Sequence, residues 1–361
     1  MRIILHIDLD YFFAQVEENL NPSLKNKIVV VCVFSGRTKD SGVVSTSNYK
    51  AREYGIKSGM PVYLAKKILK DKGAVFLPVN HSLYEEISHQ IMELLRNFAD
   101  NFEQVSIDEA YLEITKRVEG KFEEALKLAK SIKERVFEKE ELICSIGIGS
   151  NKLLAKIGSD LNKPNGLTII KPSEVKDVLS DLTTEKLPGV GRKYKKLLDN
   201  EGIKTIGELA VFDVGSLKLL LGKKIGERIH RASLGLDDEP VKEELPKQFS
   251  RIITLKEDSN NFECVSNSLN ELCGDVWSTT RNGGFNFKSV GLITVTDELK
   301  IRSKSKTLSH PIVGKDDITR IAKELLKELL EEGSDLRIRR VGVKAYNLVK
   351  DLDQRSIDSY L

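Results

Sequence analysis

Three carboxylates stand where short strand-like segments end. Asp8 lies at the end of the apolar run Ile3–Leu9, and the adjacent residues Asp108 and Glu109 separate two β-rich segments. Adjacent carboxylates repel each other, so such a pair tends to attract a cation or to rise in pKa. Mg²⁺ binds oxygen ligands, commonly a few carboxylates together with substrate phosphates, and two such ions promote phosphoryl transfer. These residues therefore indicate metal-dependent phosphoryl-transfer chemistry.

The pattern alone leaves two questions open. An Asp-Glu pair at the tip of a hairpin is also typical of a solvated turn. Asp10 shares the strand parity of Asp8, so periodicity does not decide which of the two would bind a metal.

A second group of residues suits a triphosphate. Tyr49 and Arg52 are three positions apart on a predicted helix and therefore share a face. Lys163 precedes Pro164-Asn165-Gly166, a turn sequence that holds the lysine on a loop. Arginine offers phosphate a bidentate fork, and lysine offers a point charge. The alternative explanation is a solvated helix face and a surface lysine beside a turn.

Alternating segments must position these residues. Over residues 1–170 the pattern predicts a β-α-β-β-α-β layout on a mostly antiparallel sheet, as in ferredoxin-like folds. The predicted strands span residues 3–9, 27–34, 102–107, 110–114 and 143–148, and the predicted helices span residues 11–20, 47–54, 61–69, 83–98, 122–137 and 152–161. The layout sets Asp8 at the end of the first strand and the Asp-Glu pair at a hairpin tip.

The chain changes character beyond residue 183, so we predict an α+β multidomain protein. Residues 184–236 have the pattern of short helices, and residues 237–248, which are acidic and contain two prolines, form a predicted linker. Residues 249–347 predict a separate α+β unit, followed by a tail at 348–361. The predicted strands of that unit span residues 251–255, 289–296, 300–305 and 337–343, and its predicted helices span residues 262–280 and 315–330.

Two further features suit nucleic acid. Pro188-Gly189-Val190-Gly191-Arg192, before a Lys-rich segment, is a helix-hairpin-helix signature whose glycines let backbone N–H groups approach a phosphate. A glycine-rich connection between two helices is the alternative. Cations at alternate positions of predicted strands line one face and suit successive phosphates. They are Lys300, Arg302, Lys304 and Lys306 on one strand, and Arg337 and Arg339 on another. An edge strand protected by lysines is the alternative.

Composition narrows the class of protein. The 361 residues are 40% hydrophobic and 31% charged, which excludes a disordered chain, and the length suits roughly 2–3 domains. No run of about 18 apolar residues occurs, so we expect no membrane partner. The net charge of +3 gives no whole-chain argument for nucleic acid.

The four cysteines form no C-x-x-C pair, so we expect free buried thiols in a reducing compartment and no zinc site. They are Cys32, Cys144, Cys264 and Cys273.

Several motifs in one order resemble those of the Y-family DNA polymerases, the lesion-bypass enzymes, and the archaeal members look most similar. The motifs include Ile7-Asp8-Leu9-Asp10-Tyr11-Phe12-Phe13, Thr46-Ser47-Asn48-Tyr49-Lys50-Ala51-Arg52, Ser106-Ile107-Asp108-Glu109-Ala110-Tyr111, Asn162-Lys163-Pro164-Asn165-Gly166 and Leu187-Pro188-Gly189-Val190-Gly191. Their order, their spacing and the total length agree over nearly the whole chain.

The resemblance implies an active site. Asp8, Asp108 and Glu109 would bind two Mg²⁺ ions, and the backbone carbonyl of Leu9 would complete one metal shell. The resemblance thereby favours Asp8 over Asp10. Glu109 would lie nearest the primer 3′-oxygen, which attacks the α-phosphate of a deoxynucleoside triphosphate.

The resemblance also implies a nucleotide pocket. Its triphosphate contacts would be the side chains of Thr46, Tyr49, Arg52 and Lys163 and the backbone amides of Tyr11, Phe12 and Phe13. The Phe13 ring would lie under the sugar and exclude a 2′-hydroxyl. Small residues at 42–45, with Gly59 nearby, would cover the nascent base pair, although Val43 is bulkier than the expected Ala or Gly.

The same resemblance implies the domains and partners. Residues 1–183 would form palm and fingers, 184–236 a thumb and 249–347 a DNA-binding little finger. The tail resembles a sliding-clamp binding peptide through Gln354, Ile357, Tyr360 and Leu361. We expect a cytoplasmic, nucleoid-associated monomer that uses primer–template DNA, dNTPs and the clamp. No exonuclease segment is visible, so we expect low fidelity.

Two rival functions share part of this pattern. Nucleotide cyclases and cyclic-dinucleotide synthases use a ferredoxin-like palm with two metals, but they would not need Leu187–Arg192 or the basic strands. A DNA-binding scaffold with an inactive palm would not need intact Asp8, Asp108 and Glu109. A template-directed DNA polymerase accounts for all of these features.

Overall fold

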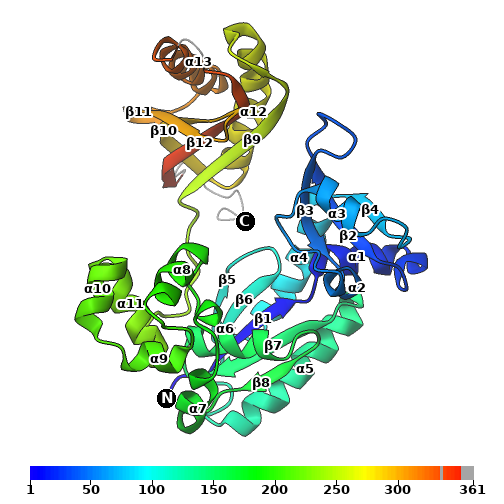
Figure 1. Cartoon of the computed structure of the whole chain (residues 1–361), viewed down its shortest axis with the longest axis vertical. Helices are drawn as coiled ribbons and strands as arrows, with labels where there is room; N and C mark the ends of the chain where they lie inside the picture. The colour runs from blue at the N-terminus through cyan, green and yellow to red at the C-terminus, as the bar shows by residue number, and fades with distance from the viewer. Residues whose placement is uncertain (334–335, 351–361) are drawn as a thin grey trace, which may run out of the picture. The chain divides into compact units, whose positions relative to one another are not determined.

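The computed structural model describes residues 1–333 and 336–350, which divide into two compact units (Figure 1). The first unit comprises Met1–Val33, Val43–Met60 and Leu64–Glu244, and the second takes in the rest of the chain.

The first unit is built on a five-stranded sheet in the order β5-β6-β1-β7-β8. Its central strand β1 is antiparallel to both of its neighbours, and only the edge strand β8 is parallel to the strand beside it. Helix α4 precedes β5 and helix α5 precedes β7, so the predicted ferredoxin-like arrangement is confirmed, with β8 added at one edge. The elements are β1 (Ile4–Leu9), α4 (His81–Arg96), β5 (Asn101–Gln104), β6 (Glu109–Glu113), α5 (Phe122–Glu140), β7 (Cys144–Gly149) and β8 (Leu167–Ile169).

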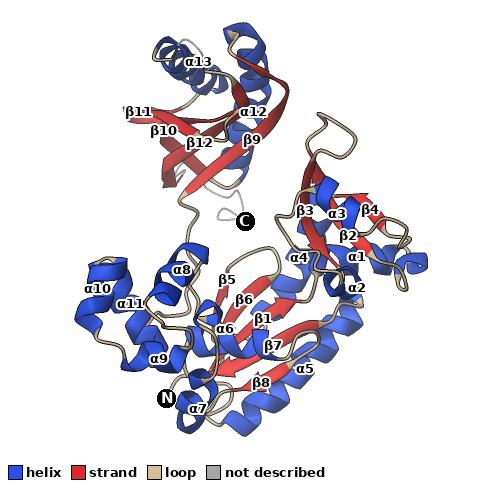
Figure 2. Ribbon diagram, viewed as in Figure 1, coloured by secondary structure: helices blue, strands red, loops and turns tan. Residues whose placement is uncertain are grey.

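Helices cover both faces of this sheet (Figure 2). Alternate residues of β1 point to opposite faces, and Leu5 and Ile7 join the core formed with α4 and α5. Helix α6 (Lys152–Leu161) packs on the other face, against β1 and β7. At Gly147 of β7 the helix comes so close that an added Cβ would lie 2.0 Å from the carbonyl oxygen of Ala155. This glycine therefore lets α6 bring its side chains beside those of β1.

A smaller sheet in the order β3-β2-β4 lies between β1 and α4 in the sequence. The pattern predicts β2 but neither β3 nor β4, because β3 is rich in small polar residues and β4 has only four residues. The elements of this part are α1 (Phe12–Leu20), η1 (Pro22–Leu24), β2 (Val29–Phe34), β3 (Gly42–Ser47), α2 (Tyr49–Glu53), α3 (Val62–Ile68) and β4 (Val75–Pro78).

Short helices follow β8, as predicted for this part of the chain. Their buried residues, such as Leu198, Leu209 and Ile229, share one core with Leu154 and Ile157 of α6. The helices are η2 (Pro172–Glu174), α7 (Val175–Ser180), η3 (Thr184–Lys186), α8 (Arg192–Asn200), α9 (Ile206–Val211), α10 (Val214–Leu221) and α11 (Lys223–Ser233).

The acidic segment that follows α11 is not a free linker. Val241 is 3% exposed and packs against Ala155. The Asp237 carboxylate accepts a hydrogen bond from the Leu153 N–H at the start of α6 (3.1 Å). The part of the predicted linker that precedes Leu245 therefore belongs to the first unit and packs on it. Its charges and prolines gave no sign that one valine of the segment is buried.

The second unit contains a four-stranded antiparallel sheet in the order β11-β10-β12-β9. Helices α12 and α13 contribute most of the core on one face of this sheet, as the α+β pattern predicts. The strands extend beyond the predicted ranges because their outer ends are polar. The elements are β9 (Gln248–Ser259), α12 (Phe262–Asn282), β10 (Phe285–Thr296), β11 (Ile301–Ile312), α13 (Lys315–Glu331) and β12 (Ile338–Lys350).

All four cysteines are free, and three of them are buried as predicted. Cys264 is exposed on α12, so the prediction of a buried thiol is wrong there. Within the described ranges, no helix combines the length and the apolar content that crossing a membrane requires.

Candidate active site

The strand register places two of the predicted acids opposite each other. Asp8 on β1 pairs with Glu109 on β6, and the Leu9 N–H donates to the Asp108 carbonyl oxygen (2.9 Å). Directly opposed residues of an antiparallel pair project from the same face. This is the face that α6 covers, and Asp8 is only 6% exposed there.

Two lysines lie among these carboxylates. Lys156 Nζ donates to Glu109 Oε1 (2.6 Å) and lies 3.4 Å from Asp8 Oδ2. Lys163 Nζ donates to the same Asp8 oxygen (2.6 Å). Both lysines also contact Asp160, at 3.7 and 2.8 Å respectively. The acids of β1 and β6 are thus compensated by cations from α6 and the loop after it.

Lys163 was a sequence candidate, whereas Lys156 is a residue that sequence reasoning missed. Lys156 and Asp160 are four apart on α6, and this spacing also occurs on ordinary solvated helix faces. The signal that distinguishes Lys156 is the glycine at 147, because it allows α6 to approach β1. A single sequence does not show which helix that glycine will meet.

The charged cluster shifts the pKa values of its members. Burial raises the pKa of Asp8 to about 7, and the neighbouring Glu109 adds to the rise. Burial acts to raise the pKa of Glu109, but the neighbouring side chains of His6, Asp8 and Lys156 outweigh it and hold that pKa below its usual range. In the metal-free protein Asp8 therefore keeps a proton up to about pH 7 while Glu109 is ionised.

His6 lies beneath this pair and is fully buried. Its Nδ1 is 2.8 Å from Ser159 Oγ of α6, and its Nε2 is 3.7 Å from Glu109 Oε2. Burial lowers the pKa of the His6 ring. His6 thus joins β1 to α6 behind the carboxylates.

The third predicted acid points elsewhere. Asp108 accepts a hydrogen bond from Ser106 Oγ (2.6 Å). Over residues 1–333 and 336–350, no three His, Cys, Asp or Glu side chains are close enough together to hold a metal ion. The residues still fit a hard divalent cation, because the carboxylates of Asp8, Glu109 and the adjacent Asp108 supply oxygen ligands. Two of these carboxylates already bind cationic groups, the ammonium groups of Lys156 and Lys163.

The predicted triphosphate residues of helix α2 lie together. The Arg52 guanidinium lies 4.7 Å from the centre of the Tyr49 ring, which confirms that the two residues share a face. Asn48 caps the helix, because its Oδ1 accepts from the Ala51 N–H (3.0 Å). The Asn48 Nδ2 in turn donates to Glu18 Oε1 of α1 (2.7 Å). Asn48, which sequence reasoning did not single out as a site residue, thus fixes α2 to α1.

Helix α1 contributes the other predicted contacts. No side chain accepts a hydrogen bond from the first turn of this helix, so no capping side chain occupies the backbone amides of Tyr11, Phe12 and Phe13. The Phe13 ring stacks on Tyr84 of α4, with the ring centres 4.2 Å apart and the planes 18° apart. Tyr84 is buried and its hydroxyl donates to Glu17 (2.6 Å), so Phe13 rests on a fixed surface. Thr46 lies on β3, half-buried.

Three family models match this chain. The impB/mucB/samB family matches residues 7–160, the DNA polymerase-iota thumb domain matches residues 185–237, and the impB/mucB/samB family C-terminal domain matches residues 246–359. DNA polymerase IV of Nitrosopumilus maritimus is 45% identical over 361 residues, and the match covers 99% of both chains. DNA polymerase IV 1 of Methanosarcina mazei is 42% identical over 365 residues, with the same coverage.

The chain belongs to the Y family of DNA polymerases. Solved structures agree. The Y-family DNA polymerase chimera Dbh-Dpo4(243-245)-Dbh matches with a TM-score of 0.91 and 37% identity, covering 96% of this chain and 99% of that one. The insertion ternary complex of Dbh DNA polymerase matches with a TM-score of 0.72, at the same identity and coverage. The predicted Y-family fold is confirmed.

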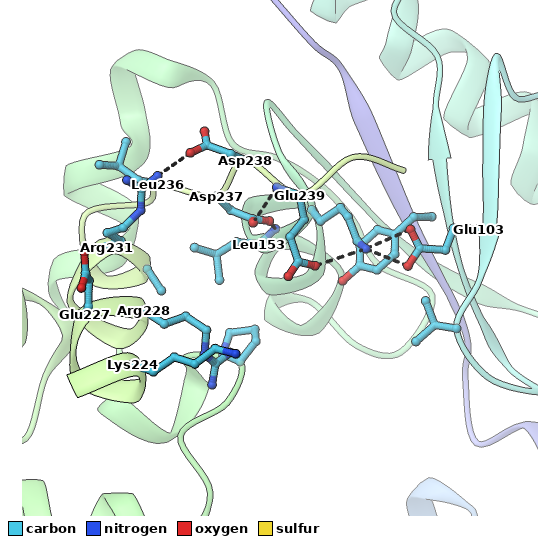
Figure 3. Close-up of a pocket in the computed structure, with 15 residues that line it drawn as sticks. Glu103, Leu153, Lys224, Glu227, Arg228, Arg231, Leu236, Asp237, Asp238 and Glu239 are labelled. Atoms are coloured by element: carbon cyan, nitrogen blue, oxygen red, sulfur yellow. Dashed lines mark hydrogen bonds and ion pairs between the residues drawn. The ribbon is translucent and has the colours of Figure 1, made fainter. Parts of the chain in front are cut away.

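The Y-family thumb meets the palm at a pocket of about 780 Å³ (Figure 3). Lys224 and Arg228 reach into it from α11, on the wall opposite Glu103 and Glu239. Within the part of the chain that the structure describes, neither of these two cations has an acidic partner. The Arg228 guanidinium lies over the hairpin, 2.4 Å from where a Cβ of Gly189 would be. Sequence reasoning identified the hairpin glycines but missed these two neighbouring cations.

Three of the predicted cations of the C-terminal sheet share one face of β11. Arg302, Lys304 and Lys306 pair across β10 with the buried Thr294, Leu292 and Val290, so they lie on the helix-covered face. Lys304 pairs with Glu328 and Glu332 of α13, and Lys306 pairs with Glu324. Lys300 precedes β11 and pairs with Glu298. The predicted shared face is confirmed for Arg302, Lys304 and Lys306, but helices cover that face and acidic residues already pair with Lys304 and Lys306.

The second predicted group of cations, Arg337 and Arg339, is already hydrogen-bonded to Asp258. Arg339 donates to the Asp258 carboxylate (3.1 Å), and Arg337 donates to the Asp258 backbone carbonyl (3.2 Å). The open face carries Arg340 and Lys344 instead, because their partners across β10 are Val295 and Gly291. The predicted clamp-binding residues, Gln354, Ile357, Tyr360 and Leu361, lie outside the described residues.

Proposed function

We propose that this chain is a template-directed DNA polymerase of the translesion type, which joins a dNTP to a primer 3′-OH with two Mg²⁺ ions. The observation that carries the proposal is the pairing of Asp8 with Glu109, with two lysines beside them and little solvent exposure. Burying charges costs stability even when they are paired. Such a cluster with strongly shifted pKa values therefore favours a catalytic role over a structural one.

The carboxylates of Asp8, Asp108 and Glu109 and the carbonyl of Leu9 would hold the ions. Bound Mg²⁺ would stabilise both the attacking and the leaving oxygen of the displacement. Asp108 accepts a hydrogen bond from Ser106 at one of its two oxygens, Oδ1, and keeps acceptor capacity for an ion. Glu109, which is ionised, is the base nearest to where the primer hydroxyl would lie.

The nucleotide would be held by groups that surround the acids. Lys163 contacts Asp8 and Asp160 in the free protein, and we expect it to turn to the triphosphate once metal ions neutralise Asp8. Arg52, Tyr49, Thr46 and the amides of residues 11–13 would supply the remaining contacts. The Phe13 ring, backed by Tyr84, would exclude a 2′-hydroxyl.

Tolerance of damaged templates would come from the small residues that cover the base pair. Val43 is 40% exposed whereas Val44 is buried, so only one of the two valines of β3 presents its side chain outward.

DNA would be held through its backbone by the thumb and the C-terminal domain. The hairpin at Gly189 and Gly191 offers N–H groups to a phosphate, and the unpaired Lys224 and Arg228 extend that site. On the open face of the second sheet, Arg340 and Lys344 supply further cations. These contacts position DNA without selecting its sequence.

The tail would recruit a sliding clamp in the cytoplasm. Removing residues 354–361 should abolish stimulation by the clamp and leave basal synthesis unchanged. Calorimetry of the clamp with both proteins measures the loss directly, and unchanged binding would contradict this part of the proposal.

Primer extension tests the proposal as a whole. Single dNTPs and Mg²⁺ are supplied on an undamaged and on an abasic template, with Asp108→Ala as the inactive control. Extension on both templates that the variant loses would support a bypass polymerase. DNA binding without extension would favour the scaffold, and cyclic products from nucleoside triphosphates without DNA would favour a cyclase.

A further inference from the structure

Asp10 is a buried carboxylate that the mechanism above does not use. It is 1% exposed, and it follows β1 two residues after the catalytic Asp8. Ser145 Oγ of β7 donates to it (3.0 and 2.9 Å to its two oxygens), and so does the Asn165 N–H (2.7 Å). The Tyr49 hydroxyl lies 3.5 Å from the oxygen Oδ1.

These donors leave Asp10 little capacity for a metal. A carboxylate offers about four lone-pair sites. Both oxygens of Asp10 already accept hydrogen bonds from protein groups. The Asp8 carboxylate, by contrast, is contacted by the ammonium groups of two lysine side chains and by no backbone N–H among the hydrogen bonds of the described residues. Strand parity does not distinguish Asp8 from Asp10 as the metal ligand, but their different hydrogen-bond partners do, and they favour Asp8.

Two of the donors, Tyr49 and Asn165, come from segments that carry residues of the nucleotide pocket. Tyr49 is itself a pocket residue of α2, and Asn165 is two residues beyond Lys163 on the loop after α6. That loop is also fastened from its other side. Lys133 Nζ of α5 donates to the carbonyl oxygens of Asn165 (2.7 Å) and Gly166 (3.0 Å).

Asn165 is therefore held at both its N–H and its carbonyl. Its backbone is left-handed, with φ of 57°, a conformation that asparagine adopts more readily than most residues. With the loop fixed at this point, the base of the Lys163 side chain has a defined position. The hydrogen bond from the Asn165 N–H to Asp10 joins this loop to the end of β1.

We propose that Asp10 is a positioning residue for the incoming nucleotide, which holds the Lys163 loop and Tyr49 at the triphosphate, and that it is not a metal ligand. The proposal rests on the nucleotide pocket of the proposed function. Asp8 would bind metal, whereas Asp10 would hold the loop that carries Lys163.

Single-nucleotide incorporation by Asp10→Asn tests this role. Asparagine keeps the shape but presents an NH₂ group where the carboxylate accepts, so a hydrogen bond to a charged group is lost. We expect KM for dNTP to rise about tenfold, kcat to stay within a factor of about three, and the half-saturating Mg²⁺ concentration to remain unchanged. Asp100→Asn is the matched control, because Asp100 also accepts from a backbone N–H (Lys116, 2.7 Å) but lies outside the pocket. It should leave KM unchanged.

A double-mutant cycle with Lys163→Ala shows whether Asp10 acts through the loop. If it does, Asp10→Asn should add little to the KM of Lys163→Ala. Full additivity would overturn the proposal, as would an unchanged KM in Asp10→Asn. A fall in kcat with a shifted Mg²⁺ requirement would make Asp10 a metal ligand and would also overturn it.

Two further arms keep the test decisive. If Lys163→Ala itself leaves KM unchanged, the proposed pocket fails and this inference with it, whereas an effect of Lys163→Ala without one of Asp10→Asn defeats the inference alone. Should Asp10→Asn not fold, Ser145→Ala replaces it. Ser145 bridges Asp10 to the Gly166 N–H (3.1 Å), so its loss should raise KM by a smaller factor, and no rise would contradict the proposal.

Discussion

The palm and the C-terminal sheet both place lysines beside glutamates, with different consequences. In the palm, Lys156 is 22% exposed and lies between Glu109 and Asp8, which are themselves mostly buried. In the C-terminal unit, Lys304 reaches Glu328 and Glu332 of α13, which are 57% and 70% exposed. The first cluster shifts the pKa of a carboxylate to about 7, whereas the second is an ordinary set of surface ion pairs.

The difference in solvent exposure between the two clusters distinguishes charged groups that shift one another's pKa values from ordinary surface ion pairs. Charges near the surface interact weakly because water screens them, but charges packed between a sheet and a helix depend strongly on one another. The regular stripe on β11 is visible in the sequence as cations at alternate positions. The irregular set of Asp8, Glu109 and Lys156 is the one that the fold brings together.

The largest effect should come from a change in the palm cluster. Glu109→Gln removes a charge from the proposed metal site and from the base nearest the primer. We expect kcat to fall about 10³-fold, equivalent to ~4 kcal/mol of transition-state stabilisation. Single-turnover primer extension measures the loss. Glu113→Gln, on the same strand and face, is the control, and equal losses in both variants would refute the special role of Glu109.

A smaller effect should appear in stability. Lys156→Met removes a half-buried cation from two acids and keeps the length of the side chain. We expect the free energy of unfolding to fall by about 2 kcal/mol, less than for a fully buried pair because Asp8 can take up a proton. Calorimetry of the metal-free protein should show a lower Tm for the first unit. Lys304→Met should leave Tm unchanged, and a similar fall in both would contradict the comparison.

The pH dependence of metal binding is a further test of the palm cluster. Because burial raises the pKa of Asp8 to about 7, a metal ion must displace a proton below that pH. The half-saturating Mg²⁺ concentration should therefore rise about tenfold per pH unit below pH 7 and level off above it. Mg²⁺ titrations of primer extension between pH 6 and 8 measure this. A flat profile would show that Asp8 is already ionised.

Stability should respond to pH with the opposite sign. Asp8 is protonated in the native protein up to about pH 7 but has an ordinary value of 3.8 when unfolded, so the native state holds more protons between these limits. The contribution of Asp8 to stability is therefore present at low pH and is lost as the pH rises through 7. Denaturant titrations of the metal-free protein at pH 5 and 8 would show the difference.

Much of the fold was predictable because it depends on local patterns. The alternation of β1 and the apolar stripe of α4 are visible in any window of the sequence. β3 and β4 were missed because they are short or polar. The burial of Val241 was missed because it depends on a surface, formed with Ala155, that no local pattern describes.

The candidate site divides in the same way. Asp8, Asp108 and Glu109 were identified because motif order marked them. The partners that set their chemistry, Lys156 and Asp160, come from a helix whose contact with β1 depends on tertiary packing. The shared face of Arg302, Lys304 and Lys306 was predictable, but period-two arithmetic does not show which face of the sheet the helices will cover.

The smallest expected effect would sharpen the comparison at the C-terminal sheet. If the open face binds DNA, Lys344→Ala should reduce the slope of log affinity against log salt by about 0.9, the value for one phosphate contact on duplex DNA. Lys304→Ala should not change the slope, because Lys304 is on the helix-covered face and already paired with Glu328 and Glu332. Fluorescence anisotropy of primer–template DNA between 50 and about 200 mM salt measures both slopes. If Lys304→Ala alone lowered the slope, the ion pairs with α13 would have to open on DNA, and the basic stripe of β11 would be restored as the binding surface.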